Sequence, residues 1–439
     1  MTALRIWWLV RRHEHATSRV PTLLAVIAFA VTTAAALVAG AGYLAFAERA
    51  RHVDPSDALA VDAATTYTVL AILACVFMTV PIITLGGIAA RLAIARRDER
   101  LAAMRLAGAT SGQVTVMTLA EAASQALTGA ALGTLAYAAL LVPLAQIPFD
   151  GRPFSVDDLW IGVPWILAAL VTVLLLALVS GASSLRQVVV SPLGVARRVT
   201  PAPLRLIRVG IAIVALLAWP IAFNNAPHLG IVIVLAVLVA AIASINVIGP
   251  WIMMILGRMV ASTAQSPRTL LAARRVIDDP KSAWRATSAI GLAVLLAALS
   301  GIAAALSGSD SPQMPHLSAD LATGTTITLI IVMTLAATSS GAVQAAKVFD
   351  QRAQYRALAY AGVEPRTILR VRRREVMLPL AGTILLIGGF ASLLILPLGM
   401  ANDPLVIVRF AAGVIAAVTL MLAGLAASRG LVRASMRIG

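Results

Sequence analysis

Ten long apolar stretches divide this sequence and leave it one class of fold. A helix needs about 20 predominantly apolar residues to cross the hydrocarbon core of a bilayer. Hydrophobic residues make up 60% of the chain and charged residues 12%, whereas soluble domains carry about 25% charged residues. The sequence therefore predicts an all-α polytopic membrane protein. The predicted spans are 21–46, 64–90, 114–145, 161–184, 207–224, 230–256, 287–307, 321–346, 376–398 and 404–427.

The basic residues give these spans an orientation. Lysine and arginine near span ends stay on the cytoplasmic side of a membrane. With the N-terminus inside, 31 of the 35 basic residues fall in cytoplasmic segments, so both termini are expected in the cytoplasm. The same distribution explains the net charge of +16, because cytoplasmic basic segments also attract anionic lipids. Membrane lipids are therefore expected partners and nucleic acid is not. The exceptions are Arg49, Arg51, Arg152 and Arg409, the last of which is expected to snorkel to the outer surface.

A repeat divides the chain into two similar parts. At a constant offset of 254 residues, the segment between the second and third spans matches the segment between the eighth and ninth. The matched pairs are Gly87 with Gly341, Gly108 with Gly362, and Glu121 with Glu375. We therefore predict a first four-span unit with an N-terminal surface helix over 1–198, a linking two-span hairpin over 199–260, and a second, divergent four-span unit over 261–439.

Each matched segment predicts a short cytoplasmic helix, a tight turn and a helix that re-enters the membrane; we call such a segment an elbow. Glycine adopts the left-handed conformation that ends a helix, Thr110 or Ser111 can cap the helix that follows in one copy, and Pro365 can begin it in the other. An ordinary basic loop is the alternative. The candidate residues are Arg96, Arg97, Glu99, Arg100, Leu101, Met104, Arg105 and Gly108 in the first elbow, and Arg352, Tyr355, Arg356, Leu358 and Gly362 in the second.

Two acidic residues lie where the elbows re-enter the membrane. Glu375 directly follows three arginines and is therefore expected at the inner headgroup level, and the repeat places Glu121 at the same depth. An interfacial ion pair with neighbouring arginines is the expected role. A proton-carrying role is the alternative, because ionisable residues inside a span are functional candidates by default.

The sequence carries no evident catalytic motif. A nucleotide-binding P-loop needs a Gly-Lys-Ser/Thr run, and the only lysines, Lys281 and Lys347, follow proline and alanine. The single cysteine, Cys75, excludes a disulfide framework and a cysteine-based metal site. The spans also hold few of the acidic or histidine side chains that bind coupling ions. We therefore expect no enzymatic activity, metal or cofactor on this chain, and energy supplied by a partner.

The first elbow, from Arg96 through Gly108 to Thr110, together with Glu121 and the run Ser191-Pro192-Leu193-Gly194, resembles the FtsX-like (MacB-type) permease domain of ABC transporters. The resemblance covers about 65–198 and, more weakly, about 321–427. The ten-span layout is similar to that of bacitracin-resistance-type permeases. Those carry a large extracellular domain between spans seven and eight, where this chain has only about 307–320.

This resemblance implies a permease that binds a separate cytoplasmic ABC ATPase, in two copies for each chain, with ATP and Mg²⁺ bound by the ATPase. It implies that coupling helices at about 92–108 and 349–362 transmit the ATPase motion across a bacterial cell membrane. We expect export or extraction of a hydrophobic or amphipathic substrate, such as a lipid or an antibiotic. The alternative is a mechanical or signalling scaffold that controls an envelope enzyme, accessory protein or sensor kinase without transport.

Two glycines near the inner ends of spans two and eight are candidates for the substrate path. Small residues let transmembrane helices approach closely and shift against each other. Gly87 and Gly341 are therefore expected at an adjustable helix contact through which substrate enters from the lipid. Plain packing is the alternative.

Overall fold

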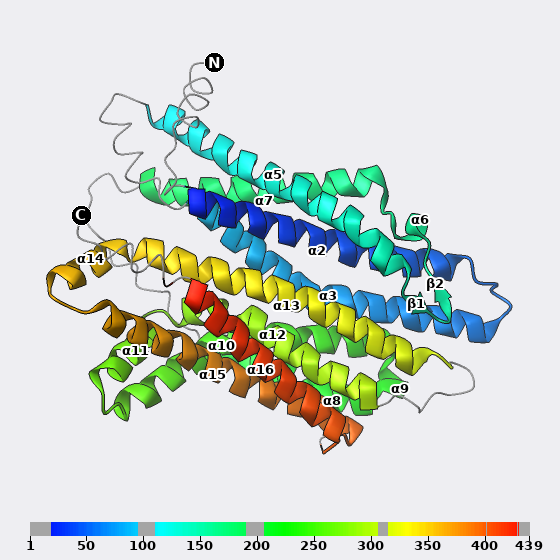
Figure 1. Cartoon of the computed structure of the whole chain (residues 1–439). Coiled ribbons are helices and arrows are strands. Elements are labelled where there is room, and N and C mark those ends of the chain that lie inside the picture. Colours follow the sequence, from blue (N-terminus) through cyan, green and yellow to red (C-terminus); the bar gives the residue numbers. More distant parts are fainter. Residues whose placement is uncertain are drawn as a thin grey trace. The chain divides into compact units, whose positions relative to one another are not determined.

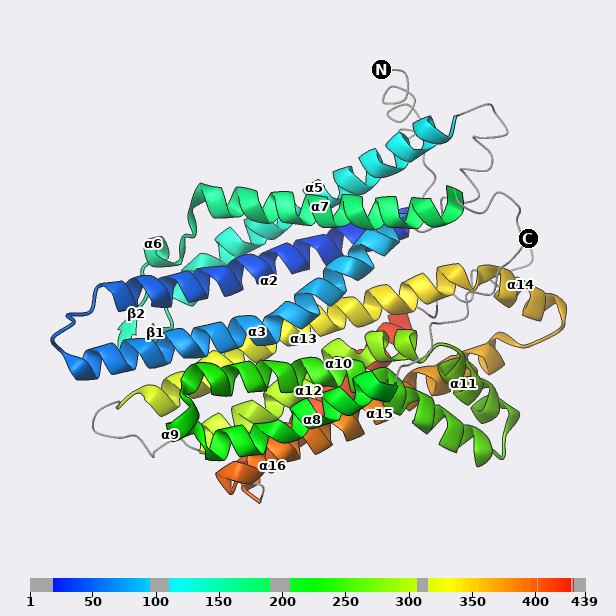
Figure 2. The same cartoon turned by 180° about the vertical axis from the view of Figure 1, so that it is seen from behind.

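A computed structural model describes residues 19–94, 110–189, 206–305, 315–400, 402–427 and 429. This part of the chain contains ten helices long and apolar enough to cross a membrane, which confirms the predicted all-α polytopic class (Figures 1 and 2). The long helices are α2 (Arg19–Arg51), α3 (Ala58–Ile94), α5 (Ser111–Ala145), α7 (Gly162–Val189), α8 (Leu206–Asn224), α10 (Ile231–Ser262), α12 (Pro280–Ala305), α13 (Leu317–Asp350), α15 (Pro365–Ile395) and α16 (Pro404–Ala427).

Short elements connect these helices. Three are single helical turns, two are longer helices, and one pair of short strands interrupts the helical pattern between α5 and α7. The short elements are β1 (Pro148–Phe149), β2 (Arg152–Pro153), α6 (Val156–Leu159), α9 (Ala226–Leu229), α11 (Pro267–Asp278), α14 (Arg352–Tyr360) and the 3-10 turn η2 (Leu396–Leu398).

The described residues group into two compact units. Unit 1 takes its residues from 1–71, 78–198 and 341–351, and unit 2 takes its residues from 72–77, 199–340 and 352–439. The helices of the predicted linking hairpin, α8 and α10, therefore group with unit 2, where α10 packs against α11, α12 and α15.

Unit 1 is built on the packing of α2 along α5. Gly129 and Gly133 are four residues apart on one face of α5, so the two backbones approach closely. A Cβ atom added at Gly129 would lie 2.6 Å from the Cβ of Phe29, and one added at Gly133 would overlap the carbonyl oxygen of Ala30. Only glycine fits at these two positions without moving α2.

A short β-hairpin, with two residues in each strand, lies beside the C-terminal end of α2 in unit 1. Asp150 and Gly151 both have positive φ, at 56° and 68°, as a type I′ turn requires. Arg49 at the end of α2 donates hydrogen bonds to the carbonyl oxygens of Phe149 (2.9 Å) and Pro153 (3.3 Å). Its guanidinium also lies 3.8 Å from the ring centre of Phe154, a cation–π contact. Arg49 thus fastens the hairpin to α2.

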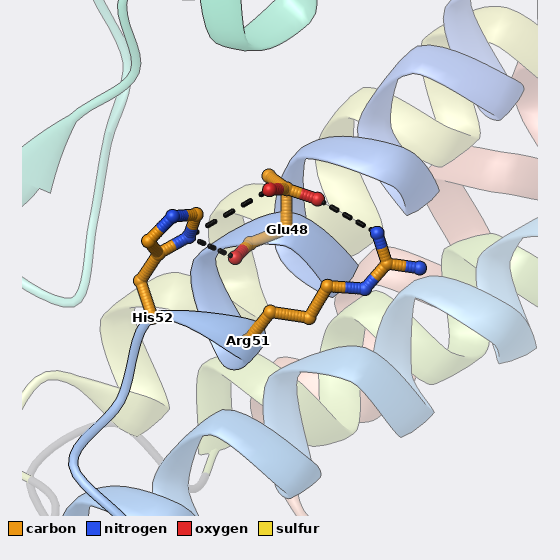
Figure 3. A network of polar contacts seen from close by, with 3 residues as sticks. All are labelled: Glu48, Arg51 and His52. Atoms are coloured by element: carbon orange, nitrogen blue, oxygen red, sulfur yellow. Dashed lines mark hydrogen bonds and ion pairs between the residues drawn. The ribbon is translucent and has the colours of Figure 1, made fainter.

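The last turn of α2 carries a small network of exposed charges (Figure 3). The Glu48 carboxylate lies 2.9 Å from the Arg51 guanidinium and 3.7 Å from the His52 ring. His52 Nδ1 also lies 3.0 Å from the Glu48 carbonyl oxygen. Exposed ion pairs of this kind contribute about 0–1 kcal/mol to the stability of the fold. We therefore interpret this network as a local feature of the helix end and not as a binding site.

Unit 2 is built around α12, almost all of whose residues are buried. Glycine again allows close approach, since a Cβ atom at Gly301 would lie 2.7 Å from the Cα of Val406 in α16. The hydroxyls of Thr287 and Thr383 share a 2.6 Å hydrogen bond that joins α12 to α15. Arg409 is partly buried, and its guanidinium donates to the carbonyl oxygen of Ser300 at 3.2 Å. Its snorkelling to the outer surface stays a prediction.

Candidate functional site: the elbow between α13 and α15

The predicted first elbow lies outside the described residues, apart from its end. The undescribed candidates are Arg96, Arg97, Glu99, Arg100, Leu101, Met104, Arg105 and Gly108. At the end of the elbow, Thr110 and not Ser111 is the N-cap of α5. The Thr110 hydroxyl accepts from the backbone N–H of Gln113 (3.3 Å), and the Gln113 side chain accepts from the backbone N–H of Thr110 (3.1 Å), which is a capping box.

The second elbow has the predicted helix, turn and re-entry. Helix α14 ends in a Schellman motif: the N–H of Val363 donates to the carbonyl of Leu358, and that of Gly362 to the carbonyl of Ala359, both at 3.0 Å. Gly362 has φ of 80°, which a residue with a Cβ adopts only at a cost. Pro365 then begins α15. This segment is therefore a helical elbow and not an irregular loop.

Tyr355 anchors α14 to the rest of unit 2. It is a coupling candidate that lies three residues before Leu358; Tyr355 is only 1% exposed, and Leu358 is half-buried. Burial raises the pKa of the Tyr355 phenol; the charge of Arg372 opposes the rise, that of Glu375 adds to it, and that of Arg275 opposes it. Tyr355 is thus packed inside the chain and offers no surface to a partner.

The exposed face of α14 is a different one. Gln354, Ala357 and Tyr360 are exposed, and Tyr360, at 72%, is the most prominent apolar side chain of the helix. The helical spacing of the sequence could have separated these faces, because residues three and four apart lie together. Arg352 and Arg356 belong to the same helix.

The N-terminal part of α15 also has an exposed face. Arg366, Arg370 and Arg373 are exposed and recur at intervals of four and three residues, which places them on one face of the helix. Together with Tyr360 they form what we call the docking face: one exposed aromatic ring followed by a row of three arginines. In the sequence, Arg366 and Arg370 indicate only topology, and Arg373 is also one of the three arginines that precede Glu375.

A second group of contacts fastens α15 to α11, and we call it the clasp. Glu375 forms an ion pair with Arg275 of α11 at 2.8 Å, with side-chain exposures of 11% and 24%. Arg374 donates to the hydroxyls of Ser266 and Thr269, both at 2.6 Å. Ser266 is the N-cap of α11, so α11 is held to α15 at both of its ends. The ion pair predicted for Glu375 exists, and the partner in it, Arg275, is 100 residues away in the sequence. The neighbouring Arg372 also interacts electrostatically with Glu375.

Glu121 occupies the matching position in α5 of unit 1. It is half-buried, and its carboxylate accepts a hydrogen bond from the side chain of Gln125 at 3.3 Å within the same helix. Its predicted pairing with an arginine stays a prediction.

The two candidate glycines of the substrate path do not lie at tight helix contacts. A Cβ atom added at Gly87 or Gly341 would meet no described atom within 4 Å. The neighbouring Gly86 is the one in contact, since its Cβ would lie 3.3 Å from the Leu176 side chain. The role of Gly87 and Gly341 in a substrate path between the two four-span units stays a prediction.

Comparison with known proteins gives a family match for one segment in the first half of the chain. A search of curated proteins finds no match. Residues 71–192 match the family model described as FtsX-like permease C-terminal. The matched stretch runs from α3 through the first elbow to α7, as expected from the residues that carry the resemblance. This membrane protein therefore contains, over residues 71–192, a domain of the FtsX-like permease family.

Proposed function

We propose that the chain is the transmembrane permease subunit of an ATP-driven ABC transporter. The observation that carries this proposal is the family match over residues 71–192, because FtsX-like permeases generally work with cytoplasmic ABC ATPases. The chain would bind two ATPase copies, one at each elbow, and would itself hold no cofactor, since ATP and Mg²⁺ would bind the ATPase.

The docking face would receive one ATPase. Exposed aromatic residues and arginines are enriched at protein interfaces, and Tyr360 is presented at the turn while Arg366 and Arg370 follow it on α15. The charge distribution of the whole sequence predicts that this end is cytoplasmic, where an ATPase would have access to it.

The contacts of α14 and α15 suggest how movement would pass into the membrane. Tyr355 is buried and lies within electrostatic range of Arg372 and Glu375 of α15, so a displacement of α14 would act on these two residues. Helix α15 runs on into the membrane as far as Ile395. Through its Thr383 it is bonded to the central helix α12. ATP-driven motion would therefore reach the core of unit 2 without a wide pore.

The substrate would be hydrophobic or amphipathic, such as a lipid or a membrane-active antibiotic, and would be exported or extracted from the bacterial cell membrane. The spans consist mainly of alanine, leucine, valine and isoleucine. Such apolar side chains suit a substrate that partitions into lipid. Open space beside Gly87 and Gly341 is compatible with an entry path there.

Reconstitution tests transport against the scaffold alternative. The chain and its cognate ATPase are placed in liposomes that contain a fluorescent lipid, and ATP-dependent transfer of that lipid to an external acceptor is measured. We expect transfer that needs ATP, the ATPase and the chain together. ATP hydrolysis stimulated by the chain, without transfer of the fluorescent lipid or of membrane-active antibiotics, would favour the scaffold.

A further inference from the structure

Helix α11 has an outward face that is partly apolar and basic. Leu270 and Leu271 are 38% and 46% exposed, and Arg274 is exposed one turn further on. The spacing of four and three residues places Leu270 and Leu271 on the same side of the helix as Arg274. The only acidic residue of α11 is Asp278, at its last position. This face therefore combines two leucines with positive charge.

The direction of this face is fixed by the contacts on the other side of α11. Ala272, Ala273 and Val276 are buried, and α11 packs against α10 and α15. A Cβ atom at Gly257 of α10 would lie 2.9 Å from the Ile277 side chain, so the two helices are in close contact. With the clasp at both ends, α11 has no freedom to turn its leucines inward.

The position of α11 in the chain keeps it near the membrane surface. The span of α10 ends at Ser262 and that of α12 begins at Pro280. Four residues join α10 to α11 and one joins α11 to α12, and a residue reaches at most about 3.6 Å. Figure 2 shows α11 at the end of unit 2, beside α15. Arg258, exposed on the last turns of α10, follows Gly257 directly.

We propose that Arg258 and Arg274, with Leu270 and Leu271, form a binding site for anionic lipid headgroups of the cytoplasmic leaflet. Amphipathic surface helices bury their apolar residues at the boundary between headgroups and acyl chains while basic residues meet the lipid phosphates. In α11 the two leucines would enter the boundary between headgroups and acyl chains, and the two arginines would bind the lipid phosphates. This site is independent of the ATPase, so it can hold or fail whatever the outcome of the proposed function.

Lipid retention tests the charged part of the site. The full chain is purified in detergent, phosphatidylglycerol is added, and bound lipid is counted by native mass spectrometry for wild type and for Arg258→Gln/Arg274→Gln. The matched control, Arg366→Gln/Arg370→Gln, removes the same charge from the docking face. We expect affinity to fall about fivefold for each site arginine removed, and to change little in the control. Equal affinity in wild type and site variant, or an equal loss in the control, overturns the proposal.

Competition distinguishes a lipid from a free anion. Phosphatidylcholine should bind no better to wild type than to the site variant, because it carries no net charge. Inorganic phosphate at millimolar concentration should leave bound phosphatidylglycerol in place, since phosphate has no acyl chain for the leucines. Full displacement by phosphate would assign the arginines to a free anion and overturn the lipid site.

Spin labelling tests whether the leucines of the site face lipid, and this test does not depend on the arginine variants. A nitroxide is attached to Leu271→Cys in a Cys75→Ser background, which removes the single native cysteine, and the protein is placed in liposomes. We expect the label to be more accessible to oxygen, which dissolves in lipid, than to a water-soluble nickel chelate. The control label at Ala357→Cys, on the exposed face of α14, should show the reverse. Greater nickel accessibility at position 271 would place this face in water and contradict the site.

Discussion

At the residue scale, two tyrosines five positions apart on α14 have opposite environments. Tyr355 is buried and Tyr360 is exposed. Replacing Tyr355 with alanine should lower the free energy of unfolding by about 3–5 kcal/mol, as for other buried aromatic residues, whereas Tyr360→Ala should change it by less than about 0.5 kcal/mol. The thermal unfolding midpoints of the two variants in the same detergent measure this difference. Equal midpoints would show that Tyr355 does not anchor the helix.

The raised pKa of Tyr355 adds a pH dependence. A group whose pKa is higher in the folded state than in the unfolded state stabilises the fold at low pH and loses that contribution as pH rises. Full stability should therefore hold below the usual tyrosine pKa of about 10 and decline above it. Tyr355→Phe, which cannot ionise, should lose less stability between pH 9 and pH 11. Parallel unfolding midpoints for wild type and Tyr355→Phe over this range would contradict the assignment.

Residue-scale features differed in how far the sequence could predict them. Gly362, Pro365 and Thr110 were predictable because helix ends depend on a few consecutive residues. The pairing of Glu375 with Arg275 was not, because it depends on how α11 packs against α15. The turn at Asp150-Gly151 could have been found, since Asp-Gly between two strands is the usual signal of a type I′ hairpin.

At the element scale, the clasp should determine whether α11 and α15 move together. Breaking its ion pair should cost between the ~1 kcal/mol of an exposed pair and the ~3–5 kcal/mol of a buried one, because its side chains are 11% and 24% exposed. Arg275→Glu and Glu375→Arg should each lower the unfolding midpoint, and the double exchange should restore part of it. If the double exchange is no more stable than either single variant, the ion pair does not hold the two helices together.

Helix contacts in unit 1 give a second prediction at this scale. Gly133→Leu should prevent α2 from packing on α5 and abolish a monodisperse protein, because even a Cβ atom overlaps Ala30. Gly87→Leu should remain folded, since it has open space. Size-exclusion profiles of the two variants compare them directly. A folded Gly133→Leu protein would show that the close approach of these helices is not required.

The elements themselves followed from the sequence, but some of their ends did not. Hydrophobicity placed all ten spans. It began the ninth at residue 376, whereas α15 begins at Pro365, because the arginine-rich segment before the span continues the same helix. Polar residues at the membrane surface carry no apolar signal, so only the capping residues show where such a helix starts.

At the scale of the whole molecule, the chain should depend on a partner for energy. Purified alone, it should hydrolyse no ATP above a mock preparation, because the sequence has no P-loop lysine. Hydrolysis should appear when the cognate ATPase is added. The class of protein and the family of residues 71–192 were accessible from sequence. The substrate was not, because apolar spans carry few side chains that distinguish one lipid-soluble molecule from another.

Binding of the ATPase to the docking face tests the central claim most directly. The affinity of the cognate ATPase for the detergent-solubilised chain is measured for wild type, for Tyr360→Ala/Arg366→Glu, and for Arg409→Gln at the opposite end of unit 2. We predict that the docking-face variant binds at least about tenfold more weakly, since loss of an interface anchor commonly costs 2 kcal/mol or more, and that Arg409→Gln binds as wild type does. Unchanged affinity of a well-folded docking-face variant would contradict the account.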